Sequence, residues 1–475
     1  MNSQTAPGFE IVEQSTARRN ARFLGSAIFF ALLILLVLTA VAYGGADPWW
    51  KAFFTCVIFV FGVFWLIERI LSDAKQIEGL DVLLPMLALV VFSFLQTVRL
   101  GQGDGSAYGI NLRLWQSISA DPYETRIFAL QLLALVVLGA LCFRYVSCER
   151  RMRTLIHVII GIALASALFG ILRQTTQHQT GFFLPVLQQD QGYGQFINRN
   201  HFAYLMEMGL GLALGLIAGG GVSRERGLIY LGALLPIWTA LVLSYSRGGI
   251  IAMLAQLVVM VLLFFAVIPA RDSSLQNSRV WRLAGSAGVR LVLVAAAVVL
   301  IGGGIFWVGG EGLVTRLEAT RGEFGEKDAS HQGVTRLRIW QATGQMIKAH
   351  PIAGVGLGGY WAAIPTYHDA SGILTPQQAH NDYLELLASG GVVGLAIGVW
   401  FVVVVFKRAR ANLRSPRPFR RAACLAALIG ITGVAVHSLV DFGLHRMINA
   451  MVFTALIIIA TCNANGDGGR LKSDA

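Results

Sequence analysis

Charged side chains are scarce in this chain of 475 residues. They make up 13% of it, about half the share found in an ordinary soluble domain. Apolar residues make up 55%, and the mean hydropathy is +0.63. This balance excludes an ordinary soluble protein. Because the apolar residues fall into stretches of about 17–25 with short polar gaps, the pattern indicates a polytopic membrane protein.

Cysteine is also scarce, and the chain has no internal repeat and no low-complexity segment. No metal-ligand spacing occurs among the 5 cysteines, which are Cys56, Cys142, Cys148, Cys424 and Cys462. They therefore predict neither a disulfide framework nor a zinc site.

The hydrophobic stretches predict twelve transmembrane helices, and thus an all-α polytopic membrane fold. The first stretch follows three arginines and exceeds the hydrophobic region of a signal peptide, so we expect an uncleaved anchor. The expected spans are 23–43, 50–71, 80–98, 126–146, 154–173, 201–220, 228–244, 249–270, 290–310, 381–405, 422–440 and 446–461.

The 38 Lys and Arg residues outnumber the 26 Asp and Glu residues, which gives a net charge of +12. In a soluble protein this excess would suggest nucleic acid, but in a membrane protein it first reports topology. An N-terminus in the cytoplasm places the basic clusters at 150–153, 224–226 and 407–421 on the inside. The positive-inside rule therefore predicts that both termini are cytoplasmic, and we expect no nucleic-acid partner.

Three sizeable segments then lie on the outer side, at 99–125, 174–200 and 311–380. The last is the longest, and long connections often carry function. We therefore expect helices 1–9 in residues 1–310, a large outer loop with short helices in residues 311–380, and helices 10–12 with a cytoplasmic tail in residues 381–475.

One amphipathic helix is expected within the large loop, over residues 335–350, and Pro351 would end it. Arg336 and Arg338 lie away from its apolar side. That apolar side is expected to hold Leu337, Trp340 and Ile347.

A glycine-rich segment, 354–359, follows this helix. Successive backbone N–H groups in such a segment can form an anion-binding nest. Glycine-rich turns in a membrane loop more often serve tight packing, so both interpretations stay open.

Polar residues gather at the outer ends of the even-numbered spans. In the expected topology these spans run from outside to inside, so their N-termini face the same aqueous side. Each N-terminus presents about half a positive charge, and an arginine there is unfavourable by roughly 0.3–1 kcal/mol. The residues concerned are Arg199, Asn200 and His201 at the sixth span, Arg247 at the eighth, His380 at the tenth and Arg446 at the twelfth.

These arginines predict an anion site at the outer boundary of the membrane. A phosphate or diphosphate would compensate the clustered positive charge, and the planar guanidinium can bind two phosphate oxygens at once. The alternative is that the arginines reach lipid headgroups or pair with loop carboxylates. For Arg199 and Arg247 together we favour the anion site.

His380 is the candidate general base, because a helix N-terminus favours the neutral imidazole that a base requires. The alternative is a structural histidine, with Asp382 or Glu385 as the base. Glu207 and His437 lie inside spans, where a titratable residue either serves function or forms a hydrogen bond between helices.

Four motifs together resemble the bacterial O-antigen ligase and polysaccharide polymerase family. They lie in order between about residues 195 and 400, whereas the first 150 residues match only as hydrophobic helices. The motifs are Asn198–Ala203, which is more typical of exopolysaccharide polymerases, Ser244–Gly249, His350–Gly358, and His380–Glu385 followed by Gly390, Gly391 and Gly394.

The resemblance implies a membrane glycosyltransferase of the C-type architecture, in the bacterial inner membrane, with its active site facing the periplasm. Such proteins move a glycan from undecaprenyl diphosphate to an acceptor hydroxyl with inversion, without nucleotide sugar, metal or other cofactor. Arg247 and His380 would be catalytic, as the stabiliser of the leaving diphosphate and as the base. The expected substrate-binding residues are Arg199, Asn200, His201, Ser246, Arg336, Arg338, Asn381 and Tyr383.

A polymerase and a ligase differ in the acceptor, which is a second lipid-linked glycan for the polymerase and lipid A-core for the ligase. The Asn198–Ala203 motif favours the polymerase. Further expected partners are membrane lipids and a chain-length regulator or flippase. An anion transporter is a more distant alternative, because a transporter would place its site near the midplane and often shows an inverted repeat.

Overall fold

The computed structural model describes residues 7–72, 76–99, 106–107, 110–111, 117–176, 192–267, 299, 303, 336–368 and 376–463. Within these residues the chain forms 13 α-helices and one hairpin of two-residue strands. Eight of the helices are long and apolar enough to cross a membrane, and three shorter apolar helices accompany them. The protein is therefore an all-α polytopic membrane protein, as the composition predicts.

The elements coincide with eleven of the twelve expected spans, and the ninth, 290–310, lies almost wholly outside the described residues. The helices of the spans are α1 (Pro7–Val41), α2 (Pro48–Leu71), α3 (Leu80–Gln96), α4 (Pro122–Tyr145), α5 (Glu149–Thr176), α6 (Arg199–Ala218), α7 (Arg224–Leu243), α8 (Arg247–Val267), α14 (Asp382–Leu413), α15 (Pro418–His437) and α16 (Met447–Thr461). The remaining elements are strands β1 (Ser106–Ala107) and β2 (Ile110–Asn111), helices α12 (Arg336–Ala349) and α13 (Tyr360–Ala363), and the 3₁₀ turns η1 (Ile364–Thr366) and η2 (Gly443–His445).

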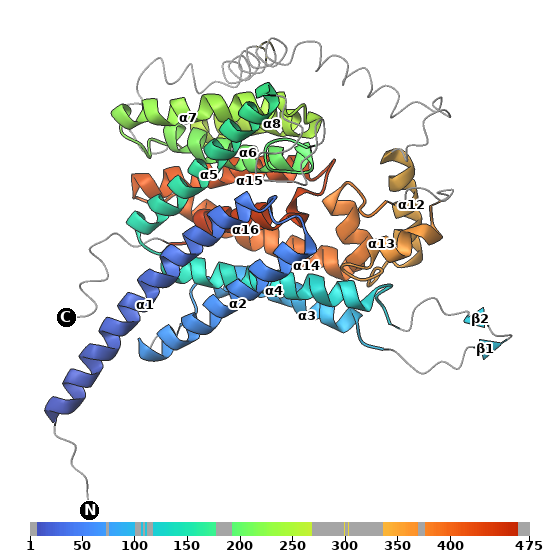
Figure 1. Ribbon diagram of the computed structural model, residues 1–475, viewed down its shortest axis with the longest axis horizontal. Helices are drawn as coiled ribbons and strands as arrows, with labels where there is room; N and C mark the ends of the chain where they lie inside the picture. The colour runs from blue at the N-terminus through green and yellow to red at the C-terminus, as the bar shows by residue number, and fades with distance from the viewer. Residues whose placement is uncertain are drawn as a thin grey trace, which may run out of the picture.

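The helices pack around α6 and α15. Helices α5, α7 and α8 lie with α6 on one side of α15 and α16, and helices α2, α3, α4 and α14 lie on the other side (Figure 1). Helices α12 and α13 lie together at one end of the bundle, beside the first part of α14 (Figure 1). The first part of the expected large loop, residues 311–335, lies outside the described residues.

Small residues let α6 and α15 approach closely. Gly211 and Gly215 on α6 and Gly219 directly after it repeat every four residues, and the backbone of α15 fills the space that a side chain there would need. A Cβ on Gly211 would come within 2.5 Å of the backbone nitrogen of Gly430, and one on Gly215 within 2.9 Å of the Cβ of Ala426. Small residues at this spacing are the usual basis of close helix packing in membranes.

Helix α14 is interrupted at Gly391, whose backbone adopts φ 59° and ψ −160°. The segment after α12 pairs with the backbone at this break: Val355 N donates to Ala388 O at 3.0 Å, and Val392 N donates to Pro351 O at 2.8 Å. Gln96 of α3 adds a hydrogen bond from Nε2 to Ser389 O at 2.9 Å. The carbonyls of Ala388 and Ser389 and the N–H of Val392 therefore have partners at the break.

The glycine-rich segment 354–359 serves this packing. The backbone N–H groups of Val355 and Gly356 donate to carbonyls of α14, and that of Leu357 donates to Gln96 Oε1 at 3.0 Å. A Cβ on Gly356 would meet Ser119, so the close approach requires glycine. Because these N–H groups already have partners, they form no anion nest.

The expected amphipathic helix is present as α12, and its buried side agrees with the expected one only in part. Its buried residues are Ile339, Ala342, Thr343 and Met346, whereas Leu337 is 44% exposed. Apolar residues lie on both sides of this helix, and contacts with Val355, Tyr360 and Ala388 decide which side is covered. The prediction was therefore wrong for Leu337, whereas Ile347 packs against this cluster and Trp340 is half-buried and donates from Nε1 to Ala379 O at 3.0 Å.

Candidate functional site

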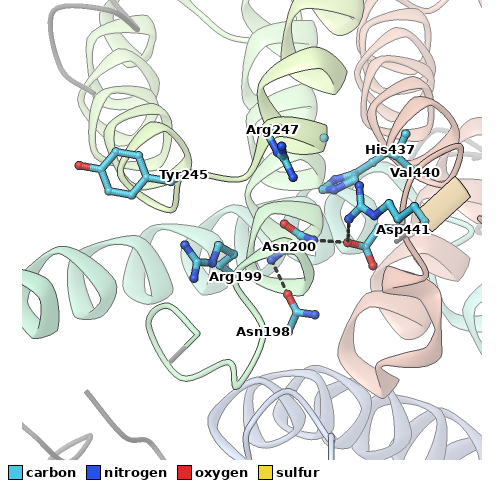
Figure 2. A pocket seen from close by; sticks show the side chains of 10 residues that line it. Asn198, Arg199, Asn200, Tyr245, Arg247, His437, Val440 and Asp441 are labelled. Carbon is cyan, nitrogen blue, oxygen red and sulfur yellow. Dashed lines mark hydrogen bonds and ion pairs between the residues drawn. The ribbon is translucent and has the colours of Figure 1, made fainter. Parts of the chain in front are cut away.

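The N-termini of α6 and α8, the first turn of α12 and the connection between α15 and α16 surround one cavity. It offers about 160 Å³ to water-sized molecules. Figure 2 shows the side chains from α6, from the start of α8 and from the end of α15 around this space. Three arginines from three different helices line it. The lining residues are Asn198, Arg199, Asn200, Tyr245, Arg247, Gly248, Arg336, His437, Val440 and Asp441.

The start of α6 is fixed by its own polar side chains. Asn198 caps the helix by accepting a hydrogen bond from Asn200 N at 2.8 Å. The hydroxyl of Ser246 donates to Asn200 Oδ1 at 2.9 Å and accepts from Gly249 N at 3.2 Å. The first turns of α6 and α8 are thereby joined, which fixes Arg199 and Arg247 on neighbouring sides of the cavity.

Asp441 is the central acid of the site, and sequence reasoning missed it. Its carboxylate accepts a hydrogen bond from Asn200 Nδ2 and from Phe442 N, the latter at 2.8 Å. Arg336 Nη2 and His380 Nδ1 each lie 3.9 Å from a carboxylate oxygen of Asp441. Asp441 therefore links the arginine-lined cavity to the candidate base. The available signal was an acidic residue in the short polar connection between two apolar spans.

His380 lies at the edge of the site in an unusual backbone conformation. Its φ is 51°, a left-handed value that costs a residue with a side chain on the order of 1–3 kcal/mol. Tyr245, which lines the cavity, has a φ of 52°. Burial lowers the pKa of His380 below its ordinary value, Arg336 acts in the same direction, and Asp441 opposes them. The imidazole is therefore neutral at pH 7.

The other two candidate bases are engaged with neighbours of their own. Asp382 Oδ2 accepts a hydrogen bond from Ser438 Oγ at 2.7 Å, and Glu385 Oε2 accepts one from Ala379 N at 2.8 Å. His445 Nε2 lies 3.8 Å from Asp382 and 3.6 Å from Glu385. None of His380, Asp382 and Glu385 lines the cavity, but His380 Nδ1 lies 3.9 Å from Asp441, which does.

Several residues expected to bind substrate lie beside the cavity rather than along its wall. His201 and Ser246 are buried behind it, and His201 accepts a hydrogen bond from Arg446 Nε at 2.9 Å. Asn381 caps α14, and Tyr383 donates to Ala435 O at 2.8 Å. Arg338 is exposed and does not line the cavity, unlike Arg336 two residues earlier.

Glu207 and His437 form a hydrogen bond between two helices. Glu207 Oε1 of α6 lies 2.7 Å from His437 Nδ1 of α15, and both side chains are almost fully buried. His437 also lines the cavity. The hydrogen bond between helices that the sequence left open is therefore present, and a function of His437 stays a prediction.

The described residues include no group of three or more His, Cys, Asp or Glu side chains placed to hold a metal ion. A reaction without metal stays a prediction.

A comparison with protein families agrees with the motifs. Residues 232–399 match the family model described as O-antigen ligase. This range includes Arg247, Arg336 and His380, whereas Arg199 and Asp441 lie outside it. No curated protein matches the chain.

The match supports a membrane glycosyltransferase of the ligase or polymerase type and does not distinguish the two. It confirms the resemblance over the three motifs that lie within residues 232–399, whereas the Asn198–Ala203 motif lies outside the match. Over residues 232–399, the chain is therefore similar to the O-antigen ligase family.

Proposed function

We propose that the protein transfers a glycan from a polyprenyl diphosphate carrier, undecaprenyl diphosphate, to the hydroxyl of a second lipid-linked glycan, as a polysaccharide polymerase does. The observation that carries the proposal is the cavity lined by Arg199, Arg247 and Arg336, beside a neutral histidine that faces Asp441. A diphosphate is the leaving group that such a cavity fits best.

The arginines account for stabilisation of the leaving group. As the bond between the anomeric carbon and the diphosphate oxygen breaks, negative charge grows on the diphosphate. Guanidinium groups held in place around it stabilise that charge more in the transition state than in the ground state. Arg199 and Arg247 project from helix N-termini, whose partial positive charge acts in the same direction.

His380 accounts for activation of the acceptor. A neutral imidazole that directs Nδ1–H toward Asp441 keeps a lone pair on Nε2, which can take the proton from the acceptor hydroxyl. Asp441 then stabilises the imidazolium that forms, as the carboxylate of a hydrolase triad does. Attack on the face opposite the departing diphosphate inverts the anomeric centre.

The choice of a polymerase rests on the Asn198–Ala203 motif. Asn198, Arg199 and Asn200 of this motif lie on the cavity wall, where the carrier diphosphate of our proposal binds. A ligase would use the same cavity and the same base with lipid A-core as the acceptor.

The experiment offers the purified full-length protein a lipid-linked glycan, with EDTA and without nucleotide sugar. We expect the glycan to lengthen, as judged by gel electrophoresis and mass spectrometry. Transfer only after addition of lipid A-core would identify a ligase instead. Protein that catalyses neither reaction, while still well folded, would contradict the proposal.

We further propose that the cavity faces the periplasm and that the connection between α14 and α15 is cytoplasmic. After Cys56→Ser removes the exposed native thiol, Lys348→Cys should react with an impermeant maleimide in spheroplasts and Arg414→Cys should not. The reverse labelling pattern would overturn both the topology and the assignment of a periplasmic donor.

A further inference from the structure

The Glu207–His437 pair lies against the cavity but has no part in the mechanism described so far. The ring of His437 is held from two sides, by Glu207 Oε1 at 2.7 Å from Nδ1 and by Tyr204, whose ring stacks on it at 4.2 Å and 19°. Nε2 is buried and has no hydrogen-bond partner among the described residues. A buried polar atom without a partner is costly unless a ligand satisfies it.

Gly248 packs closely against the Nε2 edge of this ring, where any side chain would collide with the imidazole. Both residues line the cavity, and a Cβ on Gly248 would come within 2.5 Å of His437 Nε2. The residue before it is Arg247. The unpartnered nitrogen therefore lies at the wall from which the guanidinium of Arg247 also projects (Figure 2).

We propose that His437 donates a hydrogen bond from Nε2 to a phosphate oxygen of the bound diphosphate, and that Glu207 is the positioning residue that holds and polarises the imidazole. This inference rests on the proposed function, because the anion is the leaving group of that reaction. His437 would then be a donor to the phosphate in addition to the arginines.

Counting protons shows why a buried carboxylate suits this role. With two protons on the pair, one lies on Nε2 and the other is shared between Glu207 Oε1 and His437 Nδ1. The pair is electrically neutral in either arrangement of the shared proton, so the empty site buries no net charge. When a diphosphate binds, the shared proton can move from Oε1 to Nδ1, which creates an imidazolium facing the anion and strengthens its hydrogen bond.

A simpler alternative assigns the pair only to helix packing. Two substitutions separate the possibilities. The side-chain amide nitrogen of asparagine lies near the position of histidine Nδ1, and the amide nitrogen of glutamine lies near the position of Nε2. His437→Asn keeps a donor for Glu207 and removes the donor into the cavity. His437→Gln keeps an amide N–H near the position of Nε2 and weakens the bond to Glu207.

The experiment measures binding of inorganic diphosphate to the full-length protein in detergent by isothermal titration calorimetry. We expect His437→Asn to lower the affinity about 10–150-fold, the usual range for a lost hydrogen bond to a charged group. We expect His437→Gln to stay within about threefold of the wild type. The matched control is His157→Asn, because His157 also bonds a neighbouring helix, through Tyr230 at 2.7 Å, but lies outside the cavity.

A second readout reports the moving proton. In protein with ¹⁵N-labelled histidine, diphosphate should shift the ring nitrogens of His437 toward imidazolium values, and Glu207→Gln should abolish that shift. If His437→Asn is folded and binds diphosphate as tightly as the wild type, the role of His437 is contradicted. If the wild type does not bind diphosphate at all, the anion site of the proposed function fails as well.

Discussion

Asp441 Oδ1 lies 3.9 Å from His380 Nδ1, although the two residues come from different connections, one before α14 and one between α15 and α16. The same carboxylate accepts a hydrogen bond from Asn200 at the start of α6. One acid therefore joins the candidate base to the arginine-lined cavity. The distance exceeds that of a hydrogen bond, and catalytic contacts often shorten only when the substrate is bound.

Asp441→Asn tests this relationship. We expect the rate of glycan transfer to fall on the order of 10²-fold while the affinity for the lipid-linked donor changes little, because the imidazolium loses its stabilising charge. Steady-state kinetics with a separate donor-binding assay would show it. Asp81→Asn is the control. Asp81 forms an ion pair of 2.7 Å with Arg408 and does not line the cavity, so this substitution should leave the rate unchanged. Equal effects of the two substitutions would argue against a role for Asp441.

Arg247 tests the stabilisation of the leaving group. Arg247→Lys should be nearly as damaging as Arg247→Ala, because a single ammonium cannot replace a planar fork that binds two oxygens. Loss of a contact of about 1.5–3 kcal/mol corresponds to roughly 10–150-fold in turnover. Arg338→Ala should leave turnover intact while Arg336→Ala lowers it, because only Arg336 lines the cavity. Full activity of Arg247→Ala at normal expression would remove this residue from the site.

The pH dependence of transfer tests the role of His380. The neutral imidazole is the active form, so protonation inactivates the enzyme. Because burial lowers the pKa of His380, the rate should hold down to about pH 6.5, the ordinary histidine value, and fall only below it. Asp441→Asn should move this acid limb to still lower pH, because the carboxylate raises the pKa.

His380→Gln should lose about 10²–10⁴-fold in rate together with the acid limb of the pH profile, since glutamine cannot accept the proton. Normal donor binding by this variant would show that the loss concerns chemistry. A fully active variant would rule out proton transfer by His380 and would direct attention to Asp382 or Glu385.

The close contact of α6 and α15 is tested by glycine substitutions. Gly215→Ala should lower the unfolding free energy by about 1–3 kcal/mol, because the added Cβ meets Ala426. Gly232→Ala on α7 is the matched control, since nothing lies within 4 Å of a Cβ there, and alanine should stabilise that helix slightly. Thermal unfolding in detergent measures both. An identical midpoint for the two variants would show that α6 and α15 do not require glycine at this contact.

Most of the transmembrane fold follows from the sequence because each span has its own signal in composition and length. Polar residues at the ends of the apolar stretches also located the helix starts. One cavity is lined by Arg199, Arg247 and Arg336. Two neighbouring arginines on α12 were not distinguished. Arg336 and Arg338 lie about 200° apart around the helix axis, and only tertiary packing decides which one faces the cavity.

Asp441 and the Glu207–His437 pair show what the sequence does not reveal. Asp441 belongs to no motif, and its importance arises from partners more than 50 residues away along the chain, Asn200 and His380. The pair joins α6 to α15, and only the packing of these helices shows that His437 also faces the cavity. Such contacts depend on how helices pack, which hydropathy does not encode.

The most direct test of the central claim is the stoichiometry of carrier release. Purified wild-type protein should release one polyprenyl diphosphate for each glycosidic bond that it forms, as measured by mass spectrometry of the extracted lipids against the glycan product. Arg247→Ala should reduce both products together. Glycan growth without release of polyprenyl diphosphate, or release of polyprenyl diphosphate without a new glycosidic bond, would contradict the account.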